Sequence, residues 1–207
     1  MSRPTRAKPD CAPGAACPRW RHRVHGNPSI PVPGLLLLLL LIAVPACLRA
    51  QAKTEEYHVK AGFIFHFAQL VDWPASAAGG PDFVLCTLGD DPFQGQLEAT
   101  LDGKAIGTRP IHILHVKQPQ EARGCQVLFI SNSEDQRLPK ILGELGTSPV
   151  MTVGEANDFI ERGGMIRFVL EQDKVRFEIN LKAADPAGLK FSSRLLLLAK
   201  NVIGKQG

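Results

Sequence analysis

The stretch GGMIRFVLEQDKVRFEIN, residues 163–180, decides how this chain folds. Apolar side chains occupy every second position on both sides of the polar segment EQDK: Ile166, Phe168, Leu170, Val175, Phe177 and Ile179. Period-2 alternation around a short polar turn is typical of paired antiparallel strands, so the pattern predicts a β-hairpin with a four-residue loop. Leu170 then lies opposite Val175, which sets the apolar side chains against one another across the pair.

Upstream of the hairpin, short apolar runs alternate with amphipathic segments. We predict strands at 83–88, 111–116, 127–130 and 149–153, and helices at 55–71, 92–101, 134–145, 155–162 and 194–202. Alternation of this kind predicts an α/β fold: one domain with a mainly parallel sheet and helices on both faces. The C-terminal hairpin is expected to add an antiparallel edge to that sheet.

Residues 1–50 are typical of a signal peptide behind a long basic, Pro-rich leader. Arginines at 19–23 precede the apolar run 35–44, which is short for a membrane span, and small residues follow it. We therefore predict export, with a mature domain at 51–207. Two alternatives stay open, an uncleaved N-terminal anchor and a lipoprotein signal that uses Cys47.

The leader also carries the basic character of the chain. Residues 1–50 hold seven of the 24 Lys and Arg and one of the 20 Asp and Glu, so the remainder has 17 basic and 19 acidic side chains, a net charge of −2. The net charge of +4 for the whole chain therefore gives no support to a nucleic-acid-binding function.

Cys86 and Cys125 are the two cysteines after residue 50. Two cysteines in an exported domain favour one disulfide, and each lies on a predicted core strand that a neighbouring strand can approach. The alternative, two buried thiols that pack as small apolar side chains, stays open.

The sequence offers little catalytic chemistry. No GxGxxG follows the first predicted strand, where Gly89 precedes two aspartates, and there is no GxSxG motif. Four histidines follow the leader, His58, His66, His112 and His115. Their spacing does not predict a metal cluster, and we expect exposed or hydrogen-bonded histidines. We predict no enzymatic activity, no cofactor and no metal.

The best candidate site is a polar face of the hairpin. Arg176, Glu178 and Asn180 alternate on one strand, and Arg167 lies alongside, opposite Glu178. This face either binds a small ligand or a partner, or it is a solvated sheet face with one weak ion pair.

Four segments carry a family resemblance: EYHVKAGFIFHFAQLVDWP, FVLCTLGDDPF, PVMTVGEANDFIERGGMIRF and VRFEINLKAADPAGLKFSSRLLLLAK. Together they resemble the YfiR family of exported bacterial proteins, and the resemblance covers nearly all of the chain after the leader. It implies a periplasmic α/β regulator without enzymatic activity, which represses an inner-membrane diguanylate cyclase by binding its periplasmic part. It also implies homodimers and sequestration by an outer-membrane lipoprotein.

Some members of that family carry a disulfide on the strands that hold Cys86 and Cys125. A second cysteine pair, found in some members beside the GG segment, is absent here, so redox regulation through that pair does not transfer. Two other functions stay open, a periplasmic small-molecule-binding protein and an accessory subunit of a sensor kinase.

Overall fold

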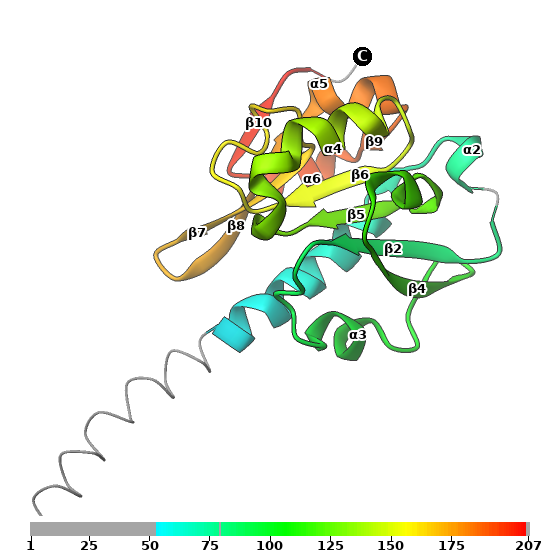
Figure 1. Ribbon diagram of the computed structural model, residues 1–207, viewed down its shortest axis with the longest axis horizontal. Coiled ribbons are helices and arrows are strands. Elements are labelled where there is room, and N and C mark those ends of the chain that lie inside the picture. Colours follow the sequence, from blue (N-terminus) through cyan, green and yellow to red (C-terminus); the bar gives the residue numbers. More distant parts are fainter. Residues whose placement is uncertain (1–52, 79, 206–207) are drawn as a thin grey trace, which may run out of the picture. The chain divides into compact units, whose positions relative to one another are not determined.

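The computed structural model describes residues 53–78 and 80–205, which all lie in one compact unit (Figure 1). The predicted signal peptide, its basic leader and Cys47 lie outside the described residues. An eight-stranded sheet has the strand order β10-β8-β7-β6-β5-β2-β4-β3. Its strands are β2 (Phe83–Leu88), β3 (Ala105–Ile106), β4 (Arg109–Val116), β5 (Val127–Ile130), β6 (Met151–Gly154), β7 (Ile166–Glu171), β8 (Lys174–Asn180) and β10 (Asn201–Ile203).

Helices and short turns connect these strands. The first helix covers residues 53–69 of the described chain. The others are α2 (Ala75–Ala78), α3 (Gln96–Leu101), α4 (Leu138–Leu145), α5 (Leu181–Ala184) and α6 (Ser193–Leu198), with 3₁₀ turns at Pro119–Gly124, Asn132–Arg137 and Asp185–Ala187. A separate antiparallel pair joins β1 (Val71–Asp72) to β9 (Lys190–Phe191).

The predicted α/β class is confirmed. Strands β4, β2, β5, β6 and β7 run parallel, whereas β7–β8 and β3–β4 are antiparallel. Helices cover both faces, with the first helix on one side and α4 on the other (Figure 1). Neighbouring residues of β2 therefore enter different cores: Leu85 packs with the first helix, and Cys86 packs with α4.

The hairpin has the predicted register. Leu170 lies opposite Val175, Phe168 opposite Phe177, and Arg167 opposite Glu178. The loop is tighter than expected, because Glu171 also pairs with Lys174 and leaves a two-residue turn. Gln172 and Asp173 both have positive φ, 50° and 59°, which is the backbone of a hairpin turn that follows the twist of the strands.

Three predicted elements differ in the structure. The segment 155–162 is a turn and not a helix, because tertiary contacts hold it: Gly164 N–H donates to Phe159 O, and the ring of Phe159 lies where a Cβ of Gly154 or Gly164 would be. The helix predicted at 92–101 begins only at Gln96. The helix predicted at 134–145 is a 3₁₀ turn followed by the shorter α4.

The C-terminal prediction also needs correction. The last helix ends at Leu198, and the chain then extends into β10, which pairs in parallel with β8. Lys200 N–H donates to Phe177 O at 2.8 Å, so pairing with the sheet replaces the last helical turn. The hairpin is therefore not the edge of the sheet over its whole length, because β10 covers part of β8.

Four phenylalanines join the first helix to the hairpin. The ring of Phe67 lies 4.8 Å from that of Phe177 and 5.7 Å from that of Phe168, and Phe63 lies 5.6 Å from Phe177. Edge-on and offset ring pairs at these separations stabilise a core beyond the area they bury. The alternation that predicts the hairpin thus also provides the surface on which the first helix packs.

We expect Phe177→Ala to lower the free energy of unfolding by about 3–5 kcal/mol, because Phe177 is only 2% exposed and its loss leaves a cavity between helix and sheet. Urea denaturation measures the change. Leu197→Ala is the matched control, since Leu197 is 86% exposed, and it should change stability by less than about 0.5 kcal/mol. Equal effects of the two substitutions would contradict this account of the core.

Candidate functional site

The predicted polar face of the hairpin has both an internal and an exposed part. Arg167, Arg176, Glu178 and Asn180 lie on the face of β7–β8 that points away from the first helix, as their register requires. Only Arg176 is exposed. Arg167 Nη2 lies 2.6 Å from Glu178 Oε2, and both side chains are largely buried. Arg167 Nε has no hydrogen-bond partner in the described structure.

Asn180 has a structural role in this arrangement. Its amide Nδ2 donates to Ile160 O at 2.7 Å, and its Oδ1 accepts from Ala183 N–H at 3.3 Å. The first bond holds the turn 157–163 against the sheet, and the second caps α5. Of the four predicted residues, Arg176 is therefore the side chain presented to solvent, and binding by this face stays a prediction.

The structure reveals a buried charged cluster that the sequence analysis missed. Lys60 is 4% exposed, and its Nζ lies 2.8 Å from Glu155 Oε1. The same Nζ contacts Glu56 Oε1, and Tyr57 OH donates to Glu155 Oε2 at 3.0 Å. The ammonium also lies 4.4 Å from the centre of the Tyr57 ring. This cluster fastens the first helix to the carboxyl end of β6.

Burial, followed by the negative charge of Glu155, raises the pKa of Tyr57 above its ordinary value. Tyr57 therefore acts as a neutral donor to Glu155. The only local signal for the cluster is Glu155 directly after the buried strand β6. Its partner lies 95 residues earlier in the sequence, so no spacing rule links the two.

An apolar hollow lies between the first helix and the hairpin tip. Its volume is about 820 Å³, and apolar side chains line it with charged residues at its rim: Val59, Phe63, Leu170, Val175, Lys53, Glu55, Glu56, Asp173 and Lys174. A second groove of about 350 Å³ continues from Phe63 between the first helix and α6, where Phe177, Arg194, Leu195 and Leu198 contribute to its wall. Leu170 is 55% exposed and Leu198 59% exposed, so this strip is open to solvent.

The four histidines are exposed or hydrogen-bonded, as expected. His115 Nδ1 lies 2.7 Å from Thr87 Oγ1, and its Nε2 lies 3.1 Å from Glu98 Oε1. His58, His66 and His112 contact Thr100, Gln69 and Asp82 respectively. Over residues 53–78 and 80–205, no group of three or more His, Cys, Asp or Glu side chains is placed to hold a metal ion. No helix in the same ranges is long and apolar enough to cross a membrane.

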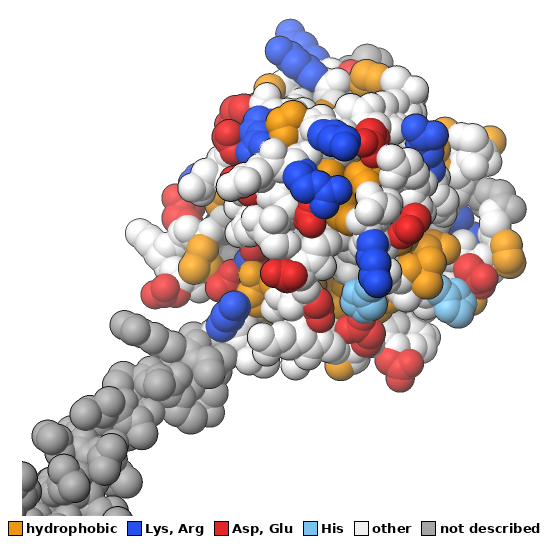
Figure 2. Space-filling view, viewed as in Figure 1, with side chains coloured by type: hydrophobic (Ala, Val, Ile, Leu, Met, Phe, Trp, Pro, Cys, Tyr) orange, Lys and Arg blue, Asp and Glu red, His pale blue; other side chains and the backbone are white. Residues whose placement is uncertain are grey.

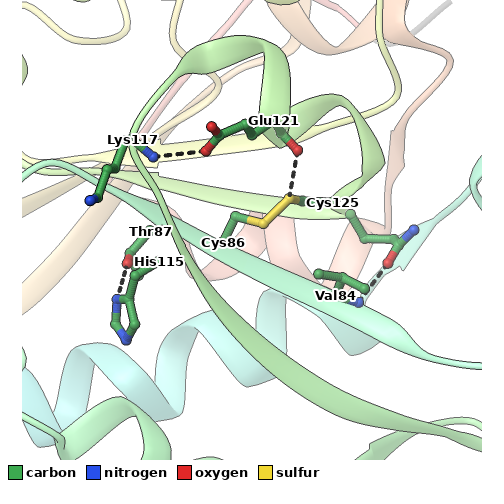
Figure 3. The surroundings of a disulfide bond; sticks show 8 residues. Val84, Cys86, Thr87, His115, Lys117, Glu121 and Cys125 are labelled. Atoms are coloured by element: carbon green, nitrogen blue, oxygen red, sulfur yellow. Dashed lines mark hydrogen bonds between the residues drawn. A yellow bond between two sulfur atoms is a disulfide. The ribbon is translucent and has the colours of Figure 1, made fainter.

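Cys86 and Cys125 form a disulfide with a Cα–Cα distance of 6.0 Å (Figure 3). Cys86 lies within β2, and Cys125 directly precedes β5, the neighbouring parallel strand. Both sulfurs are buried in the core beneath α4. The disulfide thus links two central strands across 39 residues of sequence. Of the two alternatives that the sequence leaves open, the structure has the disulfide and not two buried thiols.

Charged side chains of both signs are interspersed on the face of the molecule shown in Figure 2. No large block of Lys and Arg dominates that view. The distribution agrees with the net charge of −2 calculated for residues 51–207. It differs from the continuous basic surface typical of nucleic-acid-binding domains.

These features define a single-domain α/β protein with a mixed, mostly parallel sheet and one disulfide between central strands. The chain belongs to the YfiR/HmsC-like family, whose sequence profile matches residues 57–200. This match confirms the resemblance identified from the sequence segments. It includes the hairpin, the disulfide and the Tyr57–Lys60–Glu155 cluster.

Two solved structures are similar over part of the chain. One, the ABC domain in complex with L-Trp from Streptococcus pneumonia, has a TM-score of 0.45 and 14% identity, over 58% of this chain and 55% of that one. The other, a conserved domain protein from Vibrio cholerae, has a TM-score of 0.47 and 10% identity, over 57% and 54%. The chain therefore spans about half the length of each of these proteins.

Reduction of the disulfide should lower the free energy of unfolding by roughly 2–4 kcal/mol, because the unfolded chain regains the freedom of the closed loop. Urea denaturation with and without reductant measures the difference. The Cys86→Ala, Cys125→Ala double variant is the control and should not respond to reductant. Two free thiols in denatured, unreduced protein from the periplasm would contradict the pairing.

Breaking the buried ion pair should destabilise the fold strongly. Lys60→Met leaves the Glu155 carboxylate buried without its cation, and we expect a loss of about 3–5 kcal/mol in the free energy of unfolding. Glu155→Gln alone should also be costly, whereas the double variant should lose less than the sum of the two. A double-mutant cycle by urea denaturation measures this coupling, and additive losses would show that the pair is not coupled.

Proposed function

We propose that this protein is a periplasmic, non-enzymatic regulator that binds and represses an inner-membrane signalling enzyme, a diguanylate cyclase. The observation that carries the proposal is membership of the YfiR/HmsC-like family over residues 57–200. Membership of this family supports a role as a periplasmic regulator of cyclic-di-GMP signalling. An outer-membrane lipoprotein that sequesters the regulator, and a homodimeric state, belong to the same proposal.

The chemistry of the domain supports a binding function. Its most buried charged groups already have partners, since Lys60 is paired with Glu155 and Arg167 with Glu178. These pairs hold structural elements together, and neither of them places a nucleophile beside a base. The disulfide fits an oxidising compartment such as the periplasm.

We propose the hairpin as the surface that recognises the enzyme. Arg176 is the exposed member of the predicted polar face, and it forms no ion pair with any residue in the described ranges. Arg167, Glu178 and Asn180 support it by fixing the strands on which it stands. A charge at the rim of an interface mainly contributes specificity and association rate, so reversing it should weaken recognition without unfolding the domain.

Deletion of the gene should raise the intracellular cyclic-di-GMP concentration, and the wild-type gene should restore it. We expect Arg176→Glu to restore it only in part, because the reversed charge repels the partner surface. Lys117→Glu is the matched control, since Lys117 is exposed at the end of β4, near the opposite edge of the sheet, and it should restore repression fully. Mass spectrometry of nucleotide extracts measures the concentration.

Two results would contradict this proposal. An unchanged cyclic-di-GMP concentration on deletion would remove the link to a cyclase. Equal complementation by the Arg176→Glu and Lys117→Glu variants, at equal protein levels, would remove Arg176 from the recognition surface.

A further inference from the structure

The outer side of β8 is only partly paired. Asn180 N–H donates to Met165 O at 2.8 Å, which fixes the alternation of hydrogen bonds between β7 and β8. The backbone groups of Val175, Phe177 and Ile179 therefore point away from β7, towards β10. The β10 register covers Glu178 to Asn180, and Lys200 N–H reaches Phe177 O. No strand of the described chain pairs with Val175 on this side.

This open edge lies beside the apolar strip described above. The side chains of Val175 and Phe177 point to the first helix, where Val175 lines the larger hollow and Phe177 lines the smaller groove. Both cavities include Phe63. A strand added next to β8 would place its inward side chains over this strip, since side chains of neighbouring strands on one face lie side by side.

The opposite face of the same edge is basic. The register directs the side chains of Lys174 and Arg176 to the face opposite Val175 and Phe177, and Lys174, next to the turn, also borders the rim of the larger hollow. Both are exposed, and neither forms an ion pair in the part of the chain that the structure describes. The nearby Glu171 is already paired with Lys200 at 3.2 Å. The outward side chains of an added strand would therefore face two unpaired cations.

We propose that the outer edge of β8 at Lys174–Phe177 binds an extended segment of a partner protein in which apolar and acidic residues alternate. Its backbone pairs with the free N–H and C=O groups of Val175. Its apolar side chains fill the strip at Phe63 and Leu198, and its acidic side chains meet Lys174 and Arg176. This is strand addition to a sheet edge, in which backbone bonds supply affinity and side-chain pockets supply specificity.

The projecting hairpin gives such a segment room to approach. Figure 1 shows β7 and β8 extending beyond the neighbouring strands at one end of the sheet. The inference deepens the proposed function, because it names the surface and the chemistry of the partner segment. It can nevertheless be tested with purified protein alone, without any cyclase.

The test uses fluorescent ten-residue peptides and the mature protein purified after export. One peptide alternates Val or Leu with Glu, a second replaces Glu with Lys, and a third is the acidic peptide N-methylated at every second residue. By fluorescence anisotropy, the acidic peptide should bind at least about tenfold more tightly than either of the others. Equal binding of all three peptides, or no binding, overturns the proposal.

Two variants locate the site. Val175→Pro removes the N–H that points to the outer edge and keeps the backbone hydrogen bonds between β7 and β8. Edge positions of this kind tolerate proline. It should weaken acidic-peptide binding by about tenfold or more, whereas Val175→Thr, which keeps the N–H, should bind nearly as the wild type does. The Lys174→Glu, Arg176→Glu double variant should prefer the basic peptide. Unchanged binding by both Val175→Pro and the charge-reversed variant overturns the assignment.

Sedimentation of the wild type and the Val175→Pro variant distinguishes a second copy of this chain as the occupant. If the wild type sediments as a dimer that Val175→Pro dissociates and that the acidic peptide leaves intact, the edge binds a second copy of this chain. In that case the proposal of a segment from another protein is overturned. A negative peptide assay does not contradict the proposed regulation of a cyclase, because the cyclic-di-GMP concentration after gene deletion tests that proposal separately.

Discussion

The packing of the first helix on the β7–β8 hairpin is the interaction on which the rest of the structure depends. Phe63 and Phe67 of the helix interlock with Phe168 and Phe177 of the hairpin. This contact joins the first helix to a hairpin that follows the parallel strands in the sequence, so the sheet between them is covered on one face. It also brings Lys60 within 2.8 Å of Glu155 and forms the walls of both apolar hollows.

The hairpin could be predicted from sequence because its determinants are local. Alternation fixes which side chains face the core, and the opposite charges of Arg167 and Glu178 fix the register, so a shift by one residue would lose both. The parallel strands followed from short apolar runs, as expected for strands buried on both faces. The disulfide could only be favoured, because its formation depends on the approach of two strands that the sequence does not place.

The elements that could not be predicted are those in which distant contacts override local preference. Residues 155–162 have a helix-compatible composition, but Phe159 fits between Gly154 and Gly164, where no Cβ could be accommodated. Asn180 then holds this turn through Ile160 O. Likewise nothing in the sequence links Glu155 to its distant partner Lys60. The strand pattern places Glu178 and Asn180 on a polar face, but the fold gives both of them structural partners. Local rules gave the face of each side chain but not its neighbours.

The geometry of the hairpin separates stability from recognition. At odd-numbered positions of β8 the side chain enters the core, while the backbone groups of the same residue point sideways to the edge. At even-numbered positions the side chain points to the opposite face, where Lys174 and Arg176 are exposed and Glu178 and Asn180 are buried, and the backbone bonds to β7. Charges at 174 and 176 can therefore change without disturbing Phe177 or the ladder to β7. Under the proposed strand addition, the charge preference for the bound segment can change at little cost in stability, because the side chains of Lys174 and Arg176 lie on the side of the strand opposite Phe177.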